Sequence, residues 1–217
     1  MATKAKTEDG KTGRSALAES TRANIIEVAT AEFVDKGLAG ARIDVIADKT
    51  NSSKRMIYYY FGGKDELYRA VLEQAYAGIR SREEQLDVAA MPAEEALCAL
   101  VRHTFEYHAE HPDFVRLVMN ENILHGAHIA HLESVKDRNR TVLATLQAIL
   151  DRGVAEGVFR DAIDPLDLHL SMSALCFHIV SNRYTLKASF GVDLSPVDAR
   201  EARFEQVAAM VMAYVKR

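Results

Sequence analysis

The sequence predicts an all-α protein, and three observations lead to this fold class. Alanine and leucine are abundant while runs of β-branched residues are scarce, so the propensities favour helices along the whole chain. Apolar residues recur three and four positions apart, which is the spacing of one face of an α-helix. All four prolines stand where such a pattern begins, and the first helical turn accepts proline because the N–H that proline lacks needs no partner there.

The composition narrows the class of protein. The 217 residues, 48% of them hydrophobic and 27% charged, are enough to bury a core. No apolar run approaches the roughly 18–20 residues of a membrane span, and the polar N-terminus lacks the apolar centre of a secretory signal. Cys98 and Cys176 are far apart in apolar helical patterns, which is typical of buried free thiols in a reducing compartment. We therefore expect a cytoplasmic protein without membrane association.

The charge is unevenly distributed along the chain. The net charge of −4 argues by itself against a nucleic-acid partner. Residues 1–69, however, hold 12 Lys and Arg against 10 Asp and Glu, a net of +2, while the remainder holds 15 against 21, a net of −6. A small basic part on an acidic body is typical of a protein that contacts nucleic acid at one end.

The chain is predicted to begin with a disordered tail and one helix. Residues 1–19 are polar and have no apolar periodicity, so we expect them to be disordered. Ser20 or Thr21 can cap the helix that follows, because their hydroxyl groups accept the free N–H groups of a first turn. Gly37 is the predicted end of this helix.

Residues 42–63 are predicted to form two short helices joined by a tight turn. Asn51 tolerates the left-handed backbone conformation that such a turn needs. Ser53 is the predicted cap of the second short helix. Ile57 and Phe61, four residues apart, form the inward stripe of that helix. Three short helices, each with one apolar stripe, make a minimal helix-turn-helix domain.

Longer helices are predicted to fill the rest of the chain. One begins after the glycine pair at 62–63. The others are expected at about 92–110, 112–125, 128–156, 165–189 and 196–215. Asp164 and Ser195 precede two of the prolines and are the predicted caps of their helices, while Gly157 and Gly191 are predicted stops.

The predicted helix at 165–189 is apolar on nearly every side. Its apolar residues are Leu166, Leu168, Leu170, Met172, Ala174, Leu175, Cys176, Phe177, Ile179, Val180 and Leu186. A helix that is apolar all round must be covered all round, and in a small all-α domain this favours a second subunit. The alternative is a central helix deeply buried in a monomer. We expect a homodimer.

The helix that Ser53 caps carries an unusual set of side chains. A helix in the major groove of DNA presents its N-terminal residues to the base edges. Lys54 or Arg55 can reach N7 and O6 of guanine, and Met56 can contact a thymine methyl. The three tyrosines at 58–60 point about 100° apart, so at least one is expected to offer its hydroxyl to a phosphate. The predicted DNA-contacting residues are Arg42, Ser53, Lys54, Arg55, Met56, Tyr58, Tyr59, Tyr60 and Lys64. The alternative is a solvated basic turn with partly packed tyrosines.

Three short motifs follow one another in this part of the chain. They are FVDKGLAGA at the end of the first helix, the pair Ile46-Ala47 in the second, and IYYYFGGKDEL across the third and fourth. With the serine-led turn, they resemble the DNA-binding region of TetR-family transcriptional regulators between Thr21 and Leu72. The resemblance implies a homodimer of all-α subunits with a helix-turn-helix, a larger ligand domain and dimerisation through the last two helices. Ala41 departs from the threonine that is common there, and Arg42 is a candidate to replace its phosphate contact.

These observations predict three segments. Residues 1–19 form the disordered tail, 20–63 a helix-turn-helix DNA-binding domain, and 64–217 an effector-binding and dimerisation domain. We predict a sequence-specific transcriptional regulator, a repressor that a small apolar or amphipathic ligand releases from its double-stranded DNA operator. The alternatives are an activator and a DNA-binding protein without an effector.

Eight residues are candidates for an effector pocket, although plain core packing is the better explanation for each of them taken singly. They are Phe105, His108, Phe114, Met119, Ile123, Leu146, Phe177 and His178. Six histidines between 103 and 131 could ligate a metal with Glu121, but Gly126 is expected to interrupt the helix there. We therefore predict no metal site and no cofactor. The chain lacks the G-x-S-x-G, H-E-x-x-H and G-x-G-x-x-G patterns, and we do not expect an enzyme.

Overall fold

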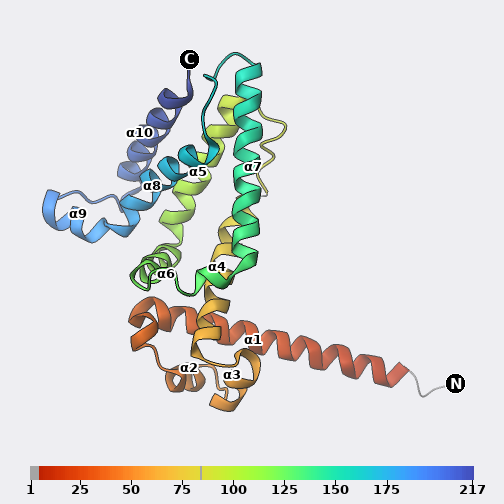
Figure 1. Ribbon diagram of the computed structural model, residues 1–217. Coiled ribbons are helices and arrows are strands. Elements are labelled where there is room, and N and C mark those ends of the chain that lie inside the picture. Colours follow the sequence, from red (N-terminus) through yellow and green to blue (C-terminus); the bar gives the residue numbers. More distant parts are fainter. Residues whose placement is uncertain (1–4, 84) are drawn as a thin grey trace. The chain divides into compact units, whose positions relative to one another are not determined.

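The computed structural model describes residues 5–83 and 85–217, with side chains from Ala16 onward. Within these ranges it contains ten α-helices, one 3-10 helix and no strand, which confirms the predicted all-α class (Figure 1). The helices are α1 (Ala5–Gly40), α2 (Ile43–Lys49), α3 (Lys54–Phe61), α4 (Lys64–Glu83), α5 (Ala93–Glu110), α6 (Pro112–Ile123), η1 (Ile129–His131), α7 (Glu133–Ala155), α8 (Pro165–Ser181), α9 (Arg183–Phe190) and α10 (Val197–Val215).

The chain folds into two compact units. The N-terminal unit extends to Gln74 and includes residues 120–130, and the C-terminal unit holds residues 75–119 and 131–217. Helices α4 and α6 each belong partly to the N-terminal unit and partly to the C-terminal unit. The predicted division between residues 63 and 64 lies at the start of α4, whereas the two compact units divide between Gln74 and Ala75 within that helix. The assignment of a function to each segment stays a prediction.

Helix α1 begins earlier than the sequence pattern indicates. It starts at Ala5, so the described part of the expected disordered tail is helical, and residues 1–4 lie outside the described residues. The segment before Ser20 contains no proline, and its two glycines cost about 1 kcal/mol each. A helix that tertiary contacts stabilise further along the chain can therefore extend back through this segment.

The predicted backbone features of the helix-turn-helix segment are confirmed. Gly37 interrupts α1 with φ 66° and ψ 174°, at the predicted end of the first helix. Asn51 adopts φ 51° in the turn between α2 and α3. Ser53 caps α3, since its Oγ accepts a hydrogen bond from the Met56 backbone N–H at 3.2 Å.

The core of the C-terminal unit surrounds α5. This helix packs against α7, α8 and α10, and it buries Leu97, Val101 and Phe105 almost completely.

The chain also approaches itself closely at Gly153, where an added Cβ would lie 2.0 Å from the buried ring of Phe159. The four prolines all lie at helix starts as predicted: Pro92 and Pro196 as the capping residues of α5 and α10, Pro112 and Pro165 as the first residues of α6 and α8.

Two predictions for the last third of the chain were wrong. The helix expected at 165–189 is two helices, because Asn182 lies between them with φ −106° and ψ 10° and donates its side-chain amide to His178 Nδ1 and Ser181 Oγ. Such local side-chain bonds compete with helix continuation. Asp164 caps α8 as predicted, but the capping residue of α10 is Pro196 and not Ser195, and no side chain makes a capping hydrogen bond there.

The connection between α6 and α7 is longer than the pattern indicates. Helix α6 ends at Ile123, and α7 begins at Glu133 rather than near residue 128. His125 and Gly126 both have positive φ, 58° and 72°, so the predicted interruption at Gly126 is confirmed. The described helices include none that is long and apolar enough to cross a bilayer.

Candidate nucleic-acid interface

Helix α3 is fastened to the N-terminal unit by two side chains and leaves the others free. Ile57 is fully buried and Phe61 is 9% exposed, so the predicted inward stripe is confirmed. The guanidinium carbon of Arg22 on α1 lies over the Phe61 ring, 5.3 Å from its centroid. The cap at Ser53 and this buried stripe together set the faces of α3 on which its other residues lie.

The remaining α3 residues face solvent. Lys54 and Arg55 are exposed, and Met56 is 37% exposed. Tyr59 is 78% exposed and Tyr58 is 52% exposed, while Tyr60 is half-buried with its ring 5.4 Å from that of Tyr59. Three consecutive tyrosines therefore do point in different directions, and two of them present their hydroxyl-bearing rings outward.

One acidic residue that the sequence reasoning did not single out organises the cations beside α3. Asp44 on α2 pairs with Lys54 at 2.7 Å and with Arg42 at 3.7 Å. The hydrogen bond from Lys54 holds the pKa of the Asp44 carboxyl below its usual range. Arg55 forms no ion pair with any residue that the structure describes. The signal for Asp44 was its position in the first turn of α2, two residues after Arg42.

Lys64 and Lys49 make local contacts. The Lys64 ammonium group donates to the Ala39 carbonyl at 3.4 Å, and so connects the start of α4 to the end of α1. Lys49 pairs at 3.2 Å with Glu32, whose side chain is only 7% exposed. Of the predicted DNA-contacting residues, Arg42, Ser53, Lys54, Arg55 and Met56 are thus gathered around the start of α3, and Lys64 has an additional structural contact.

The predicted pocket residues do not form one site. Phe105 and Leu146 are buried in the core of the C-terminal unit. His108 lies between two aromatic rings, stacked on Phe114 at 5.8 Å and edge-on to Phe177 at 5.6 Å. The other three are exposed: Met119, Ile123 and His178. Burial lowers the pKa of His108 to about 4, so the ring is neutral at physiological pH.

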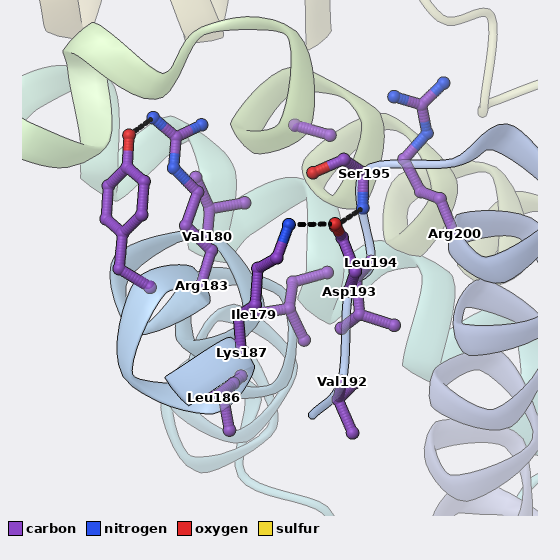
Figure 2. Close-up of a pocket in the computed structure, with 12 residues that line it drawn as sticks. Ile179, Val180, Arg183, Leu186, Lys187, Val192, Asp193, Leu194, Ser195 and Arg200 are labelled. Atoms are coloured by element: carbon purple, nitrogen blue, oxygen red, sulfur yellow. Dashed lines mark hydrogen bonds and ion pairs between the residues drawn. The ribbon is translucent and has the colours of Figure 1, made fainter. Parts of the chain in front are cut away.

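A cavity of about 390 Å³ opens beside α9 in the C-terminal unit. Figure 2 shows Lys187 and the backbone of Ser195 converging on Asp193, with contacts of 2.6 and 2.9 Å. Arg200 on α10 also lines this cavity. None of the eight predicted pocket residues lines it.

The histidines between 103 and 131 are dispersed. In the part of the chain that the structure describes, no three His, Cys, Asp or Glu side chains are grouped as metal ligands would be. Glu121 is buried and holds the turn before η1: it accepts the backbone N–H groups of His128 at 2.7 Å and Ile129 at 3.0 Å. The His128 ring in turn lies edge-on to Tyr68.

Comparison with known families agrees with this geometry. The family model described as bacterial regulatory proteins, tetR family, matches residues 25–71. A second model, described as tetracyclin repressor-like, C-terminal domain, matches residues 93–211, which is more than half of the chain.

Relatives and solved structures cover most of the chain. The HTH-type transcriptional repressor NicS of Pseudomonas putida is 36% identical over 191 residues, 88% of this chain and 90% of that protein. The repressor SCO4008 of Streptomyces coelicolor is 35% identical over 159 residues, 72% and 77% of the two chains. The crystal structure of the regulator SCO4942 from Streptomyces coelicolor superposes with a TM-score of 0.67 at 25% identity, covering 90% of this chain and 98% of that one. This chain belongs to the TetR family of bacterial transcriptional regulators.

Proposed function

We propose that the chain is a repressor that binds a double-stranded DNA operator through α3, as a homodimer, and leaves it when a small ligand binds in the C-terminal unit. The observation that carries the DNA-binding part is the exposed, capped start of α3. A guanidinium, an ammonium group and a thioether are held there on one short helix that two buried residues fix in place. The relatives NicS and SCO4008 are named repressors, which favours repression over activation.

The charge contacts distinguish the roles of the basic residues. Arg55 has no competing partner among the described residues, so it is the side chain that we assign to bidentate contact with a guanine. Lys54 and Arg42 share Asp44 and can exchange that carboxylate for a phosphate, which suits positioning on the backbone. Tyr59, the most exposed ring of α3, is assigned to a phosphate.

The homodimer is supported by apolar side chains that one chain leaves uncovered. Helices α8 and α10 lie side by side in the C-terminal unit (Figure 1). Helix α8 buries Leu168, Met172, Cys176 and Ile179 inside the subunit. On the same pair of helices Leu170 is 58% exposed and Tyr214 is 49% exposed. A second copy of the chain would cover these exposed apolar side chains. The two-fold symmetry of such a dimer would present its two α3 helices to successive major grooves.

The test begins with DNA fragments selected from a random pool by the purified protein. Binding of a selected fragment is then measured by fluorescence anisotropy with the wild type and with the double variant Arg55→Ala and Tyr59→Ala. We expect the double variant to lose specific binding by more than about 100-fold, because each lost base or backbone contact contributes about 1–3 kcal/mol. Its circular dichroism and sedimentation should equal those of the wild type.

A matched control distinguishes the loss of a contact made by α3 from the general loss of one positive charge. Arg140→Ala also removes one guanidinium, but from an exposed position on α7. It should bind the selected DNA as the wild type does. Undiminished specific binding by the double variant would show that α3 does not read the operator.

A further inference from the structure

A second cavity, of about 240 Å³, opens in the C-terminal unit between the end of α4, the segment after it and α7. Its lining residues are Arg80, Glu83, Leu86, Val88, Arg138, Thr141, Val142 and Thr145. Two arginines and one glutamate give this lining a net charge of +1. Leucine and valine side chains form an apolar wall beside the charges. The lining therefore combines a cationic end with an apolar side.

Arg80 is held rigidly at the wall of this cavity. Its guanidinium donates to Glu83 at 2.6 Å and to Asn139 at 3.2 Å, and the side chains of Arg80 and Glu83 are each only 11% exposed. Its Nε is buried and has no hydrogen-bond partner among the described residues. A buried N–H without a partner is uncommon in folded proteins, and a bound ligand or water that accepts from it is one explanation.

Two further buried nitrogens in the neighbourhood of Arg80 share this property. Nδ1 of His108 and Nδ1 of His169 have no partner among the described residues. Burial lowers the pKa of both rings, and the charge of Arg80 adds to this in each case. Both buried rings thus lie within reach of the positive charge of Arg80, which pairs with Glu83.

Arg138 supplies the free charge of the cavity. It is half-buried on α7, next to Asn139, and its guanidinium forms no ion pair with any residue that the structure describes. Guanidinium groups pair with carboxylates in a planar, bidentate geometry, and a partly desolvated pair is stronger than one in open water.

We propose that this cavity binds a small organic carboxylate, with the carboxylate between the guanidinium groups of Arg80 and Arg138 and the apolar body against Leu86, Val88 and Val142. The net charge of +1 matches a monoanion and leaves a doubly charged phosphate ester uncompensated. The volume admits a compact molecule of roughly ten to fifteen non-hydrogen atoms, at the small end of ligand sites.

The carboxylate site itself does not depend on the proposed function. Only its effect on DNA binding rests on that function. Arg80 belongs to α4, and the first part of the same helix belongs to the N-terminal unit. A bound carboxylate competes with Glu83 and Asn139 for the hydrogen bonds that Arg80 donates. Its binding therefore favours a different position of the end of α4. The bound acid would thereby act on operator binding through one continuous helix.

The site is tested by isothermal titration of the full chain with benzoate and hexanoate, and with benzamide and hexanamide as neutral counterparts. We expect at least one acid to bind with a dissociation constant of about 1 mM or tighter, and the matching amide to bind at least tenfold more weakly. Arg138→Gln should weaken binding of that acid at least tenfold. Arg140→Gln, two residues away on α7 and outside the cavity, should leave it unchanged.

Three results would overturn the site: no binding of either acid, equal binding of acid and amide, or wild-type affinity in Arg138→Gln. The regulatory consequence is measured separately, by adding the acid that binds to the protein complexed with its selected DNA. Release by the wild type and retention by Arg138→Gln are expected. Acid binding without release would leave the carboxylate site in place and reject its role as the effector site, whereas failure to select any DNA would reject the proposed function alone.

Discussion

The hydroxyl group of Ser53 determines where α3 begins. Its Oγ accepts the Met56 N–H and fixes the register at which α3 begins. The rotation of α3 about its axis is set by Ile57 and Phe61, whose burial leaves Arg55 and Tyr59 exposed. The residues offered to DNA are therefore set by the cap and the buried stripe of this helix rather than by a contact with DNA.

Replacing this cap should weaken both the fold and DNA binding. We expect Ser53→Ala to lower the free energy of unfolding by about 1 kcal/mol, because an N–H of the first turn loses its acceptor. Urea unfolding followed by circular dichroism measures this change. Ser81→Ala, at an exposed position inside α4, should change it by less than about 0.5 kcal/mol. Equal effects of the two substitutions would show that the cap contributes nothing.

His108 should make the fold sensitive to acid. Its pKa in the folded protein is about 4, below the 6.5 of the free side chain, so the unfolded chain binds an additional proton between these values. The stability that this provides is fully present above pH 6.5 and is lost as the pH falls towards 4, by an amount on the order of 3 kcal/mol.

The variant His108→Gln, which does not titrate in this range, tests the assignment. Urea unfolding at pH 7 and at about pH 4.5 should show a smaller acid loss in this variant than in the wild type. His103 and His169 also have lowered pKa values, so part of the loss should remain. His131→Gln, at an exposed position, should lose as much stability as the wild type. An unchanged acid loss in His108→Gln would contradict the assignment.

At the scale of elements, α8 has more apolar surface than its own subunit covers. A charged side chain placed on the uncovered surface should separate the protomers, because the dimer would bury it without a partner. We expect Leu170→Glu to weaken dimerisation by more than about 100-fold, corresponding to about 3 kcal/mol. Sedimentation equilibrium measures the effect.

Val154→Glu provides the comparison on another helix. Val154 is 37% exposed on α7, which is not one of the two helices whose surface we assign to the dimer. This variant should sediment as the wild type does. A monomeric Val154→Glu, or a dimeric Leu170→Glu, would place the interface elsewhere.

At the scale of the whole molecule, the sequence predicts most of what depends on nearby residues. Glycine at 37, asparagine at 51, serine at 53 and the prolines each act on their own turn, and the structure has them in these roles. The break at Asn182 was missed and Ser195 was wrongly predicted as a cap, because each residue has two local options and the choice depends on its packing.

Features that join distant segments were beyond the reach of the sequence pattern. The pair of Asp44 and Lys54 depends on the angle between two short helices, and the contact of Arg80 with Asn139 joins residues 59 positions apart. The predicted pocket residues were chosen for their side-chain type along helices, so Ile123 was included although it is exposed. Which buried polar atoms lack partners becomes visible only when all neighbours are placed.

The N-terminal unit is not complete in the first 74 residues of the chain. Asn120 donates to the Phe33 carbonyl, and the turn held by Glu121 places His128 against the fully buried Tyr68. During synthesis, these residues leave the ribosome roughly 3 to 11 s after Gln74, at about 5–20 residues per second. For that interval the nascent chain lacks the His128 ring that packs edge-on against Tyr68, so the N-terminal unit can complete its core only after residue 128 has emerged.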